Sequence, residues 1–118
     1  MRNDKKNIII ELSFKFSKDI IDFSEELRLK QKHEMASQIF RSGTSIGANI
    51  REAQNAESKK DFIHKFKISA KEADELEYWL MLCQESIHYP NPKESLLEDL
   101  QTIIKIMSKI ISTSKNNN

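Results

Sequence analysis

The residues whose types and spacing could support chemistry lie between positions 41 and 52. Four polar side chains recur there at intervals of three or four residues, which places them within about 80° of one another on a helix. They are Arg41, Ser45, Asn49 and Glu52, and we call them the polar strip. A catalytic site built on them would use Glu52 as a general base and Arg41 as an anion clamp.

A structural role for the polar strip fits the sequence better than a catalytic one. No histidine or cysteine nucleophile joins the strip, and the sequence places no second carboxylate beside Glu52. An asparagine on a helix seam typically fixes how helices or subunits align. We therefore assign no catalytic residue and predict a hydrogen-bonded network along the strip.

Charge is unevenly distributed along the second half of the chain. Segment 59–71 carries one acidic residue against five lysines, which are Lys59, Lys60, Lys65, Lys67 and Lys71. Segment 72–101 carries eight acidic residues against Lys93 alone. Subunits arranged in parallel around an axis would turn the basic segments into a ring that attracts phosphate. The five lysines are thus candidate nucleic-acid contacts, with an ordinary solvated helix face as the alternative.

A short pattern suggests a different function. Arg28 and His33 are separated by four residues, as in the arginine-four-spacer-histidine pattern of HEPN ribonucleases, which are also helical bundles. Leu29 stands where that family usually has a polar residue, and the pair falls at a predicted turn rather than inside a late helix. RNA cleavage by Arg28 and His33 is the alternative to a non-enzymatic function.

Metal and cofactor sites find no support in the sequence. The three histidines, His33, His64 and His88, show no metal-ligand spacing, and the lone Cys83 occupies an apolar seam position. A zinc site or an intrachain disulfide needs more ligands or a second cysteine. We predict no metal and no cofactor, and a reducing compartment such as the cytoplasm.

The elements that position these residues are four helices. Apolar residues step by three or four positions over about 8–28, 34–56, 59–88 and 92–112, and the polar segment 113–118 reads as a frayed tail. Asn91 and Pro92 resemble a helix start, and Ser58 a helix cap. Gly43 and Gly47, inside the second helix, predict a close approach of another backbone.

The third predicted helix has apolar residues on more than one face. Tyr78, Trp79 and Leu82 lie off its seam, so a second surface must be covered. A second copy of the chain would supply that cover, and these three residues are the candidate subunit interface.

Length and composition point to one all-α domain spanning residues 1–118. Two glycines and two prolines are too few for a strand-and-turn architecture, and 31% charged residues suit a solvated helical protein. A net charge of +1 excludes a globally basic nucleic-acid binder. The apolar runs are too short to cross a membrane. Short connections between long helices predict an antiparallel up-down-up-down four-helix bundle.

The sequence resembles the 23S rRNA-intervening sequence proteins, a bacterial family of four-helix bundle proteins. Segment 38–53, which contains the polar strip, looks like the family signature, and segments 58–65 and 71–80 match a second block. Leu76 stands where many members have threonine, and 30–33 lacks the proline that many have before the second helix.

The resemblance implies antiparallel bundles that associate into homopentameric rings, with a molecular role that is largely undefined. A related group, the accessory proteins of diversity-generating retroelements, binds a reverse transcriptase and nucleic acid but is strongly basic. We therefore expect an oligomeric, non-enzymatic scaffold that binds RNA or a nucleic-acid-processing protein.

Overall fold

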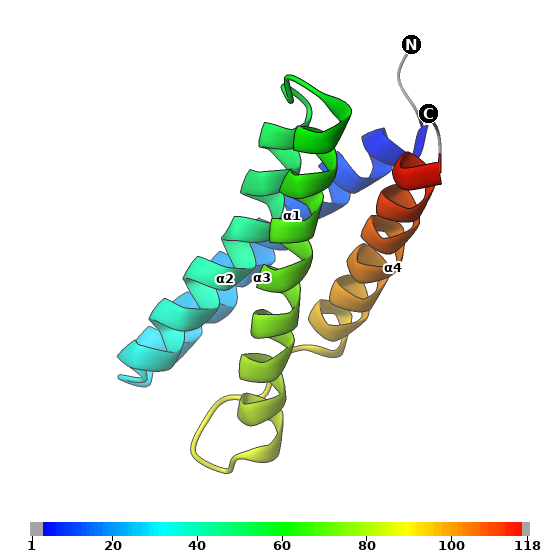
Figure 1. Cartoon of the computed structure of the whole chain (residues 1–118). Helices are drawn as coiled ribbons and strands as arrows, with labels where there is room; N and C mark the ends of the chain where they lie inside the picture. Colours follow the sequence, from blue (N-terminus) through cyan, green and yellow to red (C-terminus); the bar gives the residue numbers. More distant parts are fainter. Residues whose placement is uncertain (1–3, 117–118) are drawn as a thin grey trace.

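The computed structural model describes residues 4–116, with side chains from residue 8 onward. Within this range the chain forms four helices and no strand, so the all-α prediction is confirmed. The helices are α1 (Asp4–Leu29), α2 (His33–Ala53), α3 (Lys59–Glu85) and α4 (Glu94–Asn116). Successive helices run in opposite directions, and the bundle measures 49 × 22 × 19 Å (Figure 1).

Each helix packs against its neighbours in the chain, and α1 also packs against α4, which closes the bundle. The core consists of apolar residues at three- and four-residue steps on all four helices, including Phe16, Ile46, Phe66 and Leu100. Ser69 is buried in this core, and its hydroxyl donates to the Ile46 carbonyl at 2.9 Å, which ties α3 to α2. Burial of these side chains supplies the main driving force for folding.

Gly43 and Gly47 bring α2 close to α1. A Cβ atom on Gly43 would lie 2.7 Å from Ile20 Cγ2, and one on Gly47 would lie 3.2 Å from the Ser13 carbonyl oxygen of α1. The glycines therefore permit the close helix packing that their spacing predicts.

The connection from α1 to α2 is a Schellman turn. The Lys32 amide donates to the Leu27 carbonyl at 2.8 Å and the Gln31 amide to the Arg28 carbonyl at 2.8 Å. Gln31 has φ 63°, the left-handed conformation that glycine usually occupies in this motif. Ser58 caps α3, since its hydroxyl accepts a hydrogen bond from the Asp61 amide at 3.0 Å.

The predicted helix limits differ from the structure at several ends. The helix predicted over 34–56 stops at Ala53, where the amides of Gln54 and Asn55 bond three residues back and tighten the last turn. The helix predicted over 59–88 stops at Glu85, because Ser86 becomes extended. Ile87 continues the three- and four-residue apolar spacing of the predicted helix, which implies burial, but it lies beyond the helix end and is 95% exposed.

The last helix also differs from the prediction. It begins at Glu94 rather than at residue 92, because the first carbonyl to accept from the helix is that of Lys93, which bonds the amides of Leu96 and Leu97, and Pro92 is buried in the irregular segment before it. Residues 113–116 continue the helix, so the predicted frayed tail is wrong over those positions, and 117–118 lie outside the described residues. Lys115 in the last turn interacts favourably with the negative end of the helix dipole. The first helix begins at Asp4, earlier than the predicted residue 8.

Candidate functional site

The polar strip is held together along α2 by hydrogen bonds from side chains to the backbone one turn earlier. The Ser45 hydroxyl donates to the Arg41 carbonyl at 2.6 Å, and the Asn49 amide donates to the Ser45 carbonyl at 2.8 Å. Two of the four side chains of the strip thus donate hydrogen bonds to backbone carbonyls of α2 itself.

The two ends of the strip pair with α3. The Arg41 guanidinium lies 3.3 Å from a Glu75 carboxylate oxygen, and the Lys65 ammonium lies 2.9 Å from Glu52. The bond to Glu52 raises the pKa of Lys65. The strip therefore runs along the α2–α3 boundary within one chain, and the Glu52 carboxylate already has a cationic partner.

Glu75 connects the strip to the aromatic residues of α3. The Glu75 oxygen that pairs with Arg41 also accepts a hydrogen bond from the Trp79 indole at 3.1 Å. Trp79 is half-buried against the core, and the Tyr78 ring packs edge-on against it at 5.3 Å between centroids. Trp79 thus finds a hydrogen-bond partner and packing contacts within its own chain. Glu75 links the polar strip to the pair formed by Tyr78 and Trp79.

An exposed apolar surface remains on α3, which we call the α3 patch. It consists of Tyr78, Met81 and Leu82, which are 58%, 54% and 38% exposed. Two of the three were predicted as interface residues, and Met81 joins them. Nothing within the described chain covers this surface.

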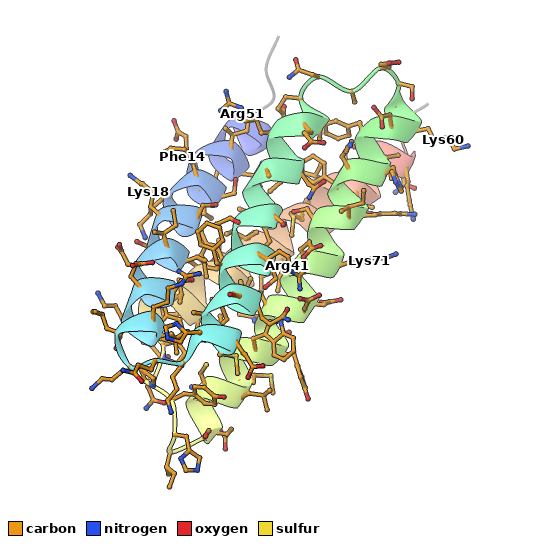
Figure 2. The ribbon with its side chains drawn as sticks, turned by 90° about the vertical axis from the view of Figure 1, so that its left-hand side faces the viewer. Phe14, Lys18, Arg41, Arg51, Lys60 and Lys71 are labelled. Carbon is orange, nitrogen blue, oxygen red and sulfur yellow. The ribbon has the colours of Figure 1, made fainter. Side chains whose placement is uncertain are left out.

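A second apolar surface lies between α1 and α2, and the sequence interpretation missed it. A cavity of about 500 Å³ opens between the two helices, and we call it the α1–α2 groove. Its apolar lining comes mainly from Ile10, Phe14, Ile21 and Ala48. Phe14 is 62% exposed and projects away from α1 beside Lys18 (Figure 2). The signal was present, because Phe14 and Ile21 are seven residues apart and off the core face of α1.

The five predicted lysines fall into three different surroundings. Lys65 lies in the strip with Glu52, whereas Lys59, Lys60 and Lys67 line a cavity of about 530 Å³ together with Ile63, His64 and Lys115. We call this cavity the basic pocket. Lys71 is exposed farther along α3 (Figure 2). Lys115, from the far end of the chain, was not predicted, since only the fold brings α4 to the start of α3.

The basic pocket concentrates positive charge. Lys115 approaches Lys67 closely enough to lower the pKa of Lys67 by hydrogen bonding and charge repulsion, with a further contribution from Lys71. Of the side chains that the structure describes, none that lines the pocket is acidic. Among the side chains from residue 8 to residue 116, none forms an ion pair with the four pocket lysines.

The residues of the alternative ribonuclease pattern lie at the α1–α2 turn. Arg28 pairs with Glu25 at 2.9 Å and lies over the Phe40 ring, while His33 is exposed at the first position of α2. Cys83 is fully buried, and burial raises its pKa to about 11, which keeps the thiol protonated at neutral pH. The described residues contain no cluster of three or more histidine, cysteine or acidic side chains that could hold a metal.

None of the helices in the described range combines the length and apolar character that a membrane crossing requires.

No curated protein matches the sequence. A crystal structure of a protein of unknown function from the S23 ribosomal protein family of Bacteroides thetaiotaomicron is similar, with 43% identity and a TM-score of 0.85. The similarity covers 92% of this chain and 98% of that one. Residues 5–109 match the family described as 23S rRNA-intervening sequence protein, and the chain therefore belongs to that family.

Proposed function

We propose that this protein is a non-enzymatic scaffold that assembles head to tail with copies of itself and presents repeated surfaces to RNA or a protein partner. The observation that carries the proposal is the pair of unpartnered apolar surfaces, the α1–α2 groove and the α3 patch. Exposed apolar surfaces of this kind typically mark sites of protein association.

The two surfaces lie on opposite sides of the bundle. In Figure 2, Phe14 of the groove points to one side and Lys71 of α3 points to the other. Tyr78 follows Lys71 by seven residues, so it lies on the same stripe of α3 two turns later. A symmetric dimer through one surface would therefore leave the other surface of each chain exposed, whereas a repeated head-to-tail contact covers both.

Charge at the edges of the two surfaces is complementary. Lys18 lies over the Phe14 ring at 5.5 Å, and Arg51 and one carboxylate, that of Glu11, line the groove, so the charge at its edge is net positive. On α3, Asp74 and Glu85 flank Tyr78 and Met81 along one stripe. Charges of opposite sign around matching apolar surfaces orient the two chains and speed their encounter. A second copy of this chain is thus a fitting occupant of the groove.

A head-to-tail contact repeats until it closes into a ring or extends into a filament. The family resemblance supports the closed form with five copies, a homopentamer. In such a ring every chain would contribute one groove and one patch to neighbouring interfaces. The lone, buried Cys83 suits a reducing compartment, and we place the protein in the cytoplasm.

Native mass spectrometry tests the assembly. We expect a ring of the wild-type chain, and monomers for Phe14→Glu and for Tyr78→Glu, because each buries a carboxylate in an apolar contact. Leu29→Glu is the matched control, since Leu29 is 84% exposed at the α1–α2 turn, outside both surfaces. A monomeric wild type, or a ring that persists in both variants, would contradict the proposal.

The absence of catalysis is tested separately with labelled RNA. We expect no cleavage by the wild-type protein. Cleavage that disappears in His33→Ala and in Arg28→Ala would instead establish the ribonuclease alternative, because both residues must act in that mechanism.

A further inference from the structure

The basic pocket differs in charge from the cavity that lies between α1 and α4. The cavity between α1 and α4 mixes Lys15 and Lys93 with the carboxylates of Asp19, Asp22 and Glu26. The lining of the basic pocket, over the described part of the chain, consists of four lysines, a histidine and Ile63, without a carboxylate. The Lys15 ammonium has two carboxylate partners, at 2.8 and 3.0 Å, whereas Lys67 faces another ammonium group.

Two like charges held together are unfavourable unless an anion shares them. Lys115 gains some stabilisation from the carbonyl end of α4, but Lys67 lies within α3 and gains none from that source. Lys59 and Lys60 stand in the first turn of α3, where the helix dipole adds positive potential. The pocket is therefore set up to bind anionic groups rather than to stabilise the fold.

The basic surface is longer than the pocket itself. Lys60, Lys67 and Lys71 follow one another at seven- and four-residue spacing on one side of α3, and Figure 2 shows Lys60 and Lys71 projecting to the same side. At 1.5 Å per residue, the span from Lys60 to Lys71 is about 16 Å. That length matches a run of several phosphates in a nucleic-acid strand better than one compact triphosphate.

We propose that the basic pocket, extended by Lys71, binds successive backbone phosphates of single-stranded RNA. The proposal names a ligand for the scaffold function but does not require the ring, because every pocket residue comes from one chain. Lysine contacts of this kind attract phosphate without reading base sequence, and stacking of a base on the imidazole of His64, which also lines the pocket, tolerates any base. Binding is therefore independent of sequence and sensitive to salt.

The test is a titration of labelled single-stranded RNA, about 20 nucleotides of polyuridine, against Lys67→Glu and Lys115→Glu over a range of salt. Single-stranded binding changes with a slope of about −0.7 per phosphate neutralised in a log–log plot. A variant that loses one contact should therefore have a shallower slope than the wild type. Between 1 M and 0.1 M salt, the ratio of wild-type to variant affinity should rise at least about fivefold. Lys30→Glu is the matched control, because it makes the same charge change on an exposed lysine at the opposite end of the bundle.

Three results would overturn the proposal. One is the absence of RNA binding by the wild-type protein, and another is an equal loss in all three variants, which would indicate attraction by net charge alone. The third is displacement of RNA by ATP at equal phosphate concentration, which would assign the pocket to a free nucleotide. Repeating the titration in Phe14→Glu separates this proposal from assembly: a monomer that still loses RNA binding on Lys67→Glu supports the pocket whatever the fate of the ring.

Discussion

Gly43 shows how one residue sets the distance between α1 and α2. Its missing side chain leaves room for Ile20, which is fully buried and cannot move into solvent. A methyl group there would approach three carbon atoms of Ile20 to between 2.7 and 2.9 Å. Overpacking of this kind costs about 1–3 kcal/mol, which equals or exceeds the gain of about 1 kcal/mol from replacing glycine by alanine in a helix.

We therefore expect Gly43→Ala to lower the free energy of unfolding by up to about 2 kcal/mol in chemical denaturation followed by circular dichroism. Gly47→Ala is the control and should lose less, because its Cβ atom would lie 3.1 Å from the Ser17 hydroxyl and 3.2 Å from the Ser13 carbonyl oxygen, both longer than the contacts of 2.7 to 2.9 Å with Ile20. In an Ile20→Ala background the penalty of Gly43→Ala should disappear. If Gly43→Ala cost as much in the Ile20→Ala protein as in the wild type, a clash with the Ile20 side chain would not be the cause of the penalty.

The members of the polar strip can be predicted from the sequence, but the residues they pair with cannot. Its four members and their shared face follow from spacing, but their partners, Glu75 and Lys65, depend on how α3 lies against α2. Lys115 joins the basic pocket for the same reason, since it is distant in sequence from Lys67. Contacts across the bundle depend on helix rotation and register, which the periodicity of one helix does not specify.

At the scale of the element, apolar periodicity predicts which face of α3 is buried. Phe66, Ala73, Leu76, Leu80 and Cys83 are all buried as their spacing indicates. The helix ends are less predictable, because Ser86 and Pro92 stop or delay a helix through local backbone geometry that competes with the apolar pattern. Ile87 continues the pattern in sequence but lies in the loop.

The two leucines Leu76 and Leu82 test the assigned face of α3. Leu76 is fully buried, so Leu76→Ala should cost about 2–5 kcal/mol through lost burial and a cavity. Leu82 is part of the α3 patch, and Leu82→Ala should cost no more than about 1 kcal/mol while weakening assembly. Both are compared at one low protein concentration, since assembly raises apparent stability. A cost below about 0.5 kcal/mol for Leu76→Ala would mean that the helix is rotated from the assigned orientation.

For the whole molecule, the placement of groove and patch on opposite sides distinguishes a head-to-tail contact from a symmetric dimer. Phe14→Glu damages the groove and leaves the α3 patch intact, whereas Tyr78→Glu does the reverse. Each variant alone lacks one half of every contact and should stay monomeric. Mixed together, the patch of one should dock in the groove of the other and form a one-to-one heterodimer that cannot grow, because both remaining surfaces are damaged.

Native mass spectrometry of the mixture detects this heterodimer. The measurement needs a high protein concentration, because a single contact is not strengthened by ring closure. The control mixes Phe14→Glu with the double variant Phe14→Glu/Tyr78→Glu, which retains neither surface and should yield no heterodimer. A symmetric contact through the α3 patch predicts the opposite pattern: Phe14→Glu would dimerise alone, and the mixture would add nothing. The heterodimer would therefore establish both the two surfaces and the direction in which successive chains follow one another.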